Sequence, residues 1–204
     1  MARERWCAAI ALVDVHGLGV VDSPECQQGI CWSVGAPDIR KADHTDLRKL
    51  VRSLGQKTYF SDRLARQEAG HGFLLVAWEG DLAVGDVYVW LAPAEEPELR
   101  ARLPGVALLT HLEVMAGHRN QGIGTQLLWA AEDRLFATGH EQVALGVRLD
   151  NHAAQRLYHR RGYVEWPYGQ VATTEVVYHP DGTHERRPEV CRIMVRRLGR
   201  NRFR

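Results

Sequence analysis

Two glycines, Gly122 and Gly124, lie one residue apart in the stretch RNQGIG, directly before a pattern typical of a helix. Glycine is a poor helix former, so its presence at a helix start indicates a close approach to the backbone. The first amides of a helix have no acceptor within the helix, and the helix dipole adds partial positive charge there. Arg119 can add a charge-assisted contact. The stretch therefore predicts a loop that holds a pyrophosphate group.

Two common phosphate-binding patterns do not fit this loop. No Gly-Lys-Ser/Thr follows the glycines, which excludes the Walker pattern. The dinucleotide fingerprint needs a third small residue at position 127, where Leu127 stands. The six residues alone leave one alternative open, a glycine-rich turn that only reverses the chain.

A second stretch, NHAAQRLYHRRGY at residues 151–163, follows one predicted strand later. Together the two stretches resemble the GCN5-related N-acetyltransferase (GNAT) family. Its V-x-P-x-x-R/Q-x-x-G-x-G/A box is similar to VMAGHRNQGIG, and its N-x-x-A-x-x-L-Y-x-x-x-G-F box is similar to NHAAQRLYHRRGY. This chain has Ala116 or Gly117 where a proline is usual, and Tyr163 in place of a phenylalanine. The resemblance covers roughly residues 38–198.

The resemblance implies that acetyl-CoA, as cosubstrate, binds between two parallel strands that splay apart, here 106–115 and 142–149. It implies that the backbone around Val114, Met115 and Ala116 pairs with the pantetheine arm, and that Asn151 contacts the same region. It also implies that the amides of the glycine loop hold the pyrophosphate, namely those of Arg119, Asn120, Gln121, Gly122, Ile123, Gly124 and Thr125.

Acyl transfer to an amine needs a neutral nucleophile, a polarised carbonyl and a proton for the leaving thiolate. A tyrosine hydroxyl, with a pKa of about 10, can supply that proton. The family pattern places Tyr158 near the thioester sulfur, so we expect Tyr158 to be the acid. The alternative is a packing role, because Tyr158 lies at helical spacing from Ala154. Asn151 could be only a helix cap, but the motif favours both roles together, cap and pantetheine contact.

His111 and Glu113 are the candidate general bases. Both are expected on one side of the strand that leads to the site; the histidine can take a proton from the amine directly or through water, and the glutamate can do so through a water chain. The alternative for each is a solvated or hydrogen-bonded residue on a strand face. Family members that acetylate a ribosomal protein N-terminus carry Glu in an E-V-R-x-x-N pattern, but this chain has Gly146 in GVRLDN. That difference disfavours a protein N-terminus as acceptor and leaves space beside the acetyl group.

The acceptor side is less defined by the sequence. In the family the first two helices and the last hairpin shape it. Aromatic residues there could line a pocket or simply fill the core. The acidic loop AEEPE at 94–98 could attract a cationic amine or could be a solvated loop. The aromatic candidates are Tyr59, Phe60, Trp90, Trp166, Tyr168 and Tyr178.

The element pattern expected to position these residues is β α α β β β α β α β β. After the glycines, the apolar stripe Leu127, Leu128, Ala131 and Leu135 predicts a buried helix face. On the strand 106–115, alternation places five residues on the face opposite His111 and Glu113. The fold class is therefore α/β, with a mixed, mostly antiparallel central sheet, splayed parallel strands in its middle and helices on both faces. The five residues on the opposite face are Val106, Leu108, Thr110, Leu112 and Val114.

Length and composition favour one domain with short appendages. The chain has 204 residues and a formal net charge of +1, so it carries no nucleic-acid signature. We expect an N-terminal extension of unclear structure at 1–36, an acetyltransferase domain at 37–198 and a basic tail at 199–204. No apolar run approaches the length of a membrane span, and the N-terminus does not resemble a signal peptide.

The four cysteines match no zinc pattern, so we expect reduced thiols in a cytoplasmic protein and no metal. No cysteine lies in either box, which disfavours a covalent intermediate on cysteine. The resulting hypothesis is direct transfer of acetyl from acetyl-CoA to a primary amine of a small molecule within a ternary complex. The alternatives are a peptide or protein amine acetyltransferase and a non-catalytic acyl-CoA-binding regulatory module. By family analogy a homodimer is possible.

Overall fold

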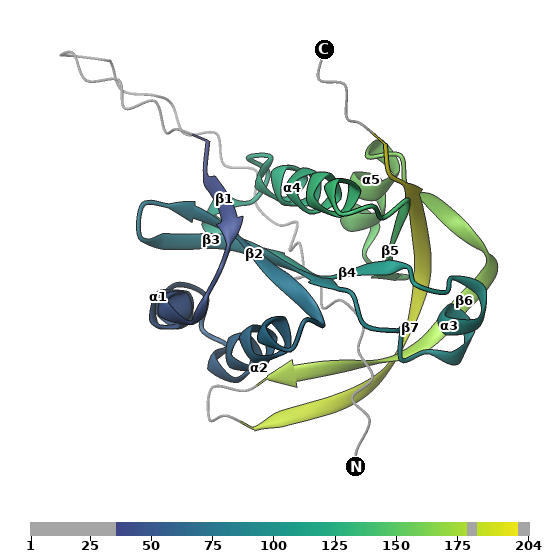
Figure 1. The fold of residues 1–204 in the computed structure, drawn as a ribbon, viewed down its shortest axis with the longest axis horizontal. Coiled ribbons are helices and arrows are strands. Elements are labelled where there is room, and N and C mark those ends of the chain that lie inside the picture. The colour runs from purple at the N-terminus through teal and green to yellow at the C-terminus, as the bar shows by residue number, and fades with distance from the viewer. Residues whose placement is uncertain (1–35, 179–182, 200–204) are drawn as a thin grey trace.

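The computed structural model describes residues 36–178 and 183–199. Most of the predicted N-terminal extension, most of the basic tail and the turn that the sequence predicts at Pro180-Asp181-Gly182 lie outside these residues. Within them, one sheet is covered by helices on both faces (Figure 1). This arrangement confirms the predicted fold class.

Seven strands form the sheet in the order β1-β2-β3-β4-β5-β7-β6. Every neighbouring pair is antiparallel except β4 and β5, which run parallel. Gly80 and Asp81 form the turn of the β2–β3 hairpin. The strands are β1 (Asp38–Lys41), β2 (Gly72–Glu79), β3 (Leu82–Trp90), β4 (Ala107–Val114), β5 (Gln142–Arg148), β6 (Val164–Tyr178) and β7 (His184–Arg197).

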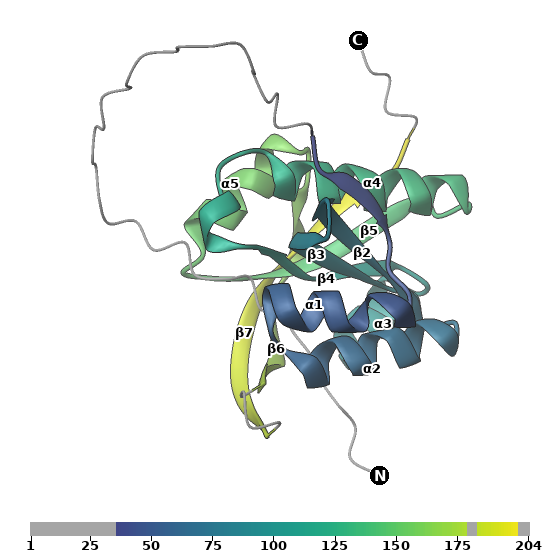
Figure 2. The same ribbon diagram turned by 90° about the vertical axis from the view of Figure 1, so that its left-hand side faces the viewer.

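Helices α1 (Leu47–Leu54) and α2 (Lys57–Glu68) cover one face, and α4 (Ile123–Ala137) and α5 (His152–Arg160) cover the other (Figures 1 and 2). Two short 3-10 turns, η1 (His44–Asp46) and η2 (Ala116–His118), precede α1 and follow β4. The predicted element order has no helix between β3 and β4, where the structure has a short helix, α3 (Pro97–Arg102). Proline at the first helical position has the backbone angle that a helix needs there, which accounts for this difference.

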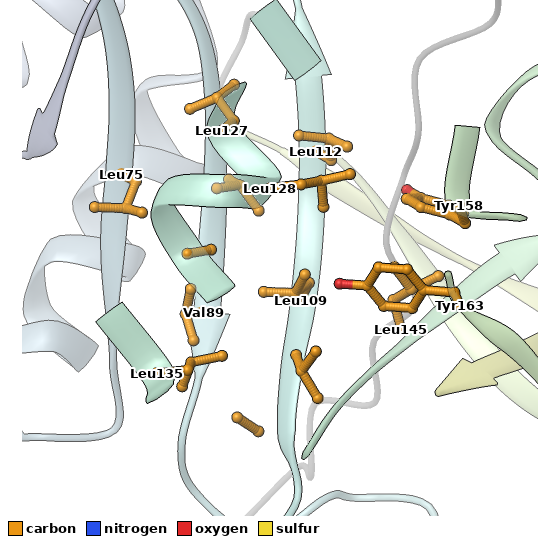
Figure 3. Close-up of a cluster of buried hydrophobic side chains, with 14 of the residues drawn as sticks. Leu75, Val89, Leu109, Leu112, Leu127, Leu128, Leu135, Leu145, Tyr158 and Tyr163 are labelled. Atoms are coloured by element: carbon orange, nitrogen blue, oxygen red, sulfur yellow. The ribbon is translucent and has the colours of Figure 1, made fainter. Parts of the chain in front are cut away.

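The predicted stripe of α4 forms the centre of the core on its face of the sheet. All four of its residues are buried, and Figure 3 shows Leu127, Leu128 and Leu135 directed at the apolar side chains of the strands. A second core lies on the opposite face, under α1 and α2, and includes Leu50 and Phe60. The two cores fix the sheet between two helical layers.

The parallel strands β4 and β5 pair over only three residues each. Ala107, Leu108 and Leu109 align with Val143, Ala144 and Leu145, and no further pairs form between these two strands. Beyond Leu109 and Leu145 the strands diverge. The predicted splay is therefore present, at the end of β4 that leads into the glycine loop.

A bulge in β4 changes which residues share a face. Between two pairing positions β3 advances by two residues, from Asp86 to Tyr88, whereas β4 spans three, from Glu113 to Thr110. His111, inside this bulge, has a φ of 52°. The extra residue moves Leu112 and Val114 to the α4 face, whereas Val106 and Leu108 pack on the α1–α2 face. The prediction of one shared face for these residues was therefore wrong.

Cys191 of β7 is fully buried and disulfide-bonded. The expectation of four reduced thiols is therefore wrong for this residue. Disulfides are typical of oxidising compartments, so Cys191 does not favour the cytoplasmic location, which stays a prediction. Among the described residues, no helix is both long and apolar enough to cross a membrane.

Candidate active site

A cavity of about 360 Å³ opens where β4 departs from β5, between the start of α4 and one face of α5. Leu112 of β4 and Tyr158 of α5 both line it, and Figure 3 shows these two side chains. The cavity thus lies between the splayed strands, where the family resemblance implies that acetyl-CoA binds. The lining residues are Leu112, Val114, His118, Arg119, Asn120, Gly122, Ile123, Gly124, Thr125, Ala153, Ala154, Leu157, Tyr158 and Arg160.

The start of α4 presents unpaired helix amides to this cavity. The first hydrogen bond of the helix runs from the Gln126 amide to the Gly122 carbonyl, at 3.0 Å. The amides of Ile123, Gly124 and Thr125 come before that bond and have no acceptor within the helix. Gly122 has a φ of 84°, a conformation that suits glycine. Backbone donors and the helix dipole together favour an anion at this position.

Gly124 has a different reason to be glycine. A Cβ there would lie 3.7 Å from a methyl of Val114 and 3.9 Å from a methyl of Leu157, which are ordinary contact distances. Packing within the protein therefore does not demand glycine. Val114 and Leu157 both line the cavity, so a side chain at 124 would occupy the cavity itself. This fits a ligand that lies against the backbone here.

The glycine loop is held against the end of β4. Nε of Arg119 donates to the Val114 carbonyl at 3.0 Å, and the Met115 amide donates to the Val84 carbonyl of β3 at 2.9 Å. The Met115 amide is thus engaged in the sheet, which makes it a poor partner for a pantetheine arm. Met115, Ala116 and Gln121 do not line the cavity, whereas the other predicted loop residues do.

Asn151 also lies outside the cavity lining. Its side-chain oxygen accepts from the Ala154 amide at 3.0 Å, which caps α5. The structure thus shows the capping role that the sequence left open. The α5 face that lines the cavity consists of Ala153, Leu157 and Arg160, which the motif did not single out. Their spacing, four and then three residues, is the helical signal that could have identified them.

Tyr158 lines the cavity although only 1% of its surface is exposed. Burial raises the pKa of Tyr158 well above its usual value of about 10. The hydroxyl therefore stays protonated at neutral pH and is available as a proton donor. Its ring packs 5.7 Å, centroid to centroid, from that of Tyr163.

An ionic anchor holds α5 in place. Glu132 of α4 is buried; it accepts from the Tyr163 hydroxyl at 3.0 Å and from Arg161 at 2.7 Å, and it contacts Arg196 of β7. Arg161 and Tyr163 directly follow α5, so this cluster ties the end of α5 to α4 and the sheet. The position of Tyr158 depends on it.

A polar cluster around His111 lies on the opposite, α1–α2 face of β4. Nδ1 of His111 donates to the Asp86 carboxylate at 3.1 Å, and its ring stacks on Tyr59 with 3.9 Å between centroids. Nε2 lies 3.1 Å from the side-chain oxygen of Gln56 and 3.4 Å from the Glu113 carboxylate. The Gln56 amide nitrogen donates to Glu113 at 2.9 Å. The two candidate bases thus lie together, as predicted.

The cluster holds a proton strongly. Burial lowers the pKa of His111, but the facing Asp86 carboxylate, and more weakly Glu113, raise it, with a net upward shift. With the Gln56 amide oriented by Glu113, both ring nitrogens face acceptors, which suits the doubly protonated ring. Loss of the proton would leave Asp86, which is fully buried, as an uncompensated charge. The pair therefore retains its proton above the usual pH range of a histidine.

The same three residues, Asp86, His111 and Glu113, have potential ligand atoms within 4.8 Å of one another. However, the two carboxylates contact different nitrogens of the ring, on its opposite sides. One metal ion takes a single nitrogen from each histidine, so these groups do not converge on one point. The arrangement suits proton transfer along Glu113, His111 and Asp86.

Sequence reasoning missed Asp86 and Gln56. Asp86 is the one acidic residue inside the apolar strand LAVGDVYVW, which is a signal that could have found it. Gln56 has a left-handed conformation between α1 and α2, and no local pattern marks it. Of the predicted acceptor-side aromatics, Tyr59, Phe60, Trp90 and Trp166 are buried and Tyr168 is exposed. The side chain of Tyr178 is outside the described set. In the acidic loop, Glu96 is buried.

Comparison with known proteins gives one family. The sequence model of the Acetyltransferase (GNAT) family matches residues 37–163. A comparison with curated proteins finds no match.

Several solved structures share the fold. The ribosomal-protein-S18-alanine N-acetyltransferase from Escherichia coli superposes with a TM-score of 0.55 at 19% identity, over 82% of this chain and 99% of that one. PaiA N-acetyltransferase from Thermoplasma acidophilum, in complex with coenzyme A, gives 0.55 at 16% identity, over 80% and 100%. YncA from Salmonella typhimurium, a putative acetyltransferase with its cofactor acetyl-CoA, gives 0.55 at 20% identity, over 83% and 98%. At these identities the likeness establishes the fold.

Proposed function

Because this chain belongs to the acetyltransferase (GNAT) family, we propose that it transfers an acetyl group from acetyl-CoA to a primary amine of a small molecule. The observation that carries the proposal is the cavity at the β4–β5 splay, with a helix-amide cradle and a protonated tyrosine on its wall. Acetyl-CoA supplies the activated acetyl thioester.

The cradle residues hold the pyrophosphate. The amides of Ile123, Gly124 and Thr125 donate to it, and Arg119 places a positive charge beside them. Arg160, which also lines the cavity, adds a second cation. Two solved structures of the same fold, those of PaiA and YncA, contain coenzyme A and acetyl-CoA respectively, and this supports the assignment.

Tyr158 acts as the acid. Its hydroxyl stays protonated, lines the cavity and gives its proton to the thiolate that leaves when the amide bond forms. Burial that keeps the phenol neutral also keeps water from competing for that proton.

The His111 cluster takes the proton from the amine on the opposite face of β4. The side chain of Glu113 is 27% exposed, against 10% for His111, so Glu113 receives the proton, directly or through water. His111 and Asp86 lie behind it and set the proton affinity of the cluster. Acid and base thus act from the two faces of the splayed strand.

Transfer is direct. Among the residues that the structure describes, no cysteine lines the cavity, and the buried Cys191 is already disulfide-bonded. No other lining side chain combines a strong nucleophile with an adjacent base.

Titration calorimetry with acetyl-CoA tests the cradle. A Gly124→Leu variant places a side chain in the cavity and is expected to lose most of its affinity. Gly117→Leu is the matched control, because a Cβ at 117 meets no atom within 4 Å and lies outside the cavity lining. Unchanged affinity in Gly124→Leu would refute the cradle.

Thiol release from acetyl-CoA against a panel of amines tests the acceptor class. The panel holds aminoglycosides, polyamines, amino acids, arylalkylamines and short peptides. Turnover with the small amines supports the proposal, and turnover with the peptides alone would replace it.

A further inference from the structure

A second cavity, of about 450 Å³, lies at the end of β5 beside the β6–β7 hairpin. Neither the phosphate cradle nor the His111 cluster contributes to it. Charged side chains dominate its wall. The lining residues are Arg148, Leu149, Asp150, Glu175, Arg187, Pro188, Glu189 and Val190.

This cavity lies on the same face of the sheet as the His111 cluster. Cys191 of β7 and Val171 of β6 belong to the core under α1 and α2. Side chains two residues apart on a strand share a face, which places Glu189 on that face, and Glu175, four residues from Val171, with it. Figures 1 and 2 show the β6–β7 hairpin extending on the side of α1 and α2. A small amine that reaches His111 therefore approaches from the side on which these carboxylates lie.

Glu189 is a buried carboxylate without a hydrogen-bond donor. Its side chain is 9% exposed, and within the described residues neither oxygen accepts a hydrogen bond. Arg148 is the nearby cation, with Nε 3.4 Å from a Glu189 oxygen. Arg148 makes shorter contacts, 3.0 and 3.1 Å, to both oxygens of Asp150. Burial, then Glu175, raises the pKa of Glu189 to about 7.

The cavity carries an excess of negative charge. Among the described residues, Asp150, Glu175 and Glu189 all lie within 4 Å of one cation, Arg148. The other lining cation, Arg187, pairs most closely with Glu185 outside the cavity, at 2.8 Å, and interacts only at longer range with Glu175, so three carboxylates stand against two cations. An ammonium or guanidinium group offers several N–H donors and a positive charge, and it could therefore donate hydrogen bonds to the Glu189 oxygens and balance their charge.

We propose that the Glu175–Glu189 cavity binds a second cationic group of the acceptor, so that the substrate of this enzyme is a small diamine or polyamine. One amine is acetylated at the splay of β4 and β5, while another is bound in the cavity by Glu175 of β6 and Glu189 of β7. This inference rests on the proposed function and names the substrate class for it.

The test compares amines that differ only in the second charge. A series of α,ω-diaminoalkanes, from diaminopropane to diaminodecane, is measured beside n-alkylamines of equal length, both by thiol release and by titration calorimetry. The variants are the double Glu175→Gln, Glu189→Gln chain and a Glu165→Gln control. Glu165 lies on β6 outside the cavity and its side chain is 50% exposed.

We expect one length of diamine to have a KM about 10- to 100-fold below that of its monoamine, the size of a charge-assisted hydrogen bond. The double variant should raise that KM to the monoamine value, with kcat and the monoamine KM unchanged. Glu165→Gln should behave as wild type. Glutamine is isosteric, so folding should be retained; if the double variant does not fold, Glu175→Gln alone carries the test.

The outcomes separate the two proposals. Diamine binding in calorimetry that depends on the two glutamates, without turnover, keeps the cavity assignment and overturns the acetyltransferase proposal. Turnover of monoamines and diamines with equal KM, unaffected by the double variant, keeps the enzyme and overturns the cavity assignment. Turnover of basic peptides alone, in a glutamate-dependent way, also overturns the small-diamine proposal.

Discussion

Replacing Asp86 by Asn should lower the pKa of His111 and shift the pH dependence of catalysis. Asparagine keeps the shape and can still accept from Nδ1 of His111, but it removes the negative charge 3.1 Å away. The carboxylate raises the histidine pKa, whereas burial lowers it, so removing the carboxylate leaves burial dominant. The direction of the shift is therefore downward.

The contact distance sets the size of this shift. Coulomb's law at 3.1 Å with an effective dielectric constant of about 20 gives an attraction of about 5 kcal/mol between unit charges, which is an upper bound. A single opposite charge in contact moves a pKa by about 1 to 3 units. Glu113 remains in place, 3.4 Å from Nε2, and still favours the protonated ring. We expect a fall of about 2 units.

Two measurements follow the change. NMR titration of the His111 ring gives its pKa directly, and the pH profile of kcat/KM gives the limb at which the cluster loses its proton. Both should move to lower pH by the same amount, and the plateau rate should fall because the cluster is a weaker base. Asp81→Asn, on the exposed β2–β3 turn, is the control and should leave both unchanged.

Each measurement can refute part of the reasoning. An unchanged His111 titration would mean that the Asp86 carboxylate does not set its proton affinity. A shifted titration with an unchanged kinetic limb would remove the His111 cluster from the rate-limiting proton transfer.

Three further predictions follow from the structure. Tyr158→Phe should lower kcat by about 100-fold or more, with the affinity for acetyl-CoA unchanged in calorimetry, and an unaltered kcat would exclude the acid role. Glu132→Ala should cost about 3 to 5 kcal/mol of unfolding free energy in urea, because it leaves buried arginines unpaired; the neighbouring, exposed Asp133→Ala should cost little. The folded-state pKa of Glu189, about 7, lies above the unfolded value near 4.5, so its contribution to stability is present below pH 4.5 and lost as pH rises through 7. The gain in melting temperature of Glu189→Gln over wild type should therefore grow across that window, and a constant difference would contradict the pKa.

Local patterns predicted the glycine loop and the start of α4 in the candidate site, because these are built from consecutive residues. The stripe from Leu127 to Leu135 and the glycines before it depend on helical spacing and on backbone freedom, which a short window reveals. The paired boxes also predicted the splay of β4 and β5.

The His111 cluster could not be predicted in the same way. Asp86 is 25 residues from His111 in the sequence, and Gln56 is 55 residues away. Their contact depends on strand register and helix packing. The bulge in β4 was not predicted because a positive φ is uncommon at a histidine, and no sequence pattern around His111 indicates a bulge. One extra residue in β4 then reversed the faces of Leu112 and Val114.

The short pairing between β4 and β5 has a thermodynamic consequence. Because the ladder between β4 and β5 stops after three residue pairs, few backbone hydrogen bonds join the two halves of the sheet, β1–β4 and β5–β7. A ligand that bridges the opening binds the folded chain and not the unfolded one, so at a concentration 100 times its Kd it adds about 2.7 kcal/mol to the stability. Amide hydrogen exchange along residues 110–114 and 146–148 should slow on binding. The lifetime of the folded protein against proteolysis would then rise and fall with the supply of that ligand.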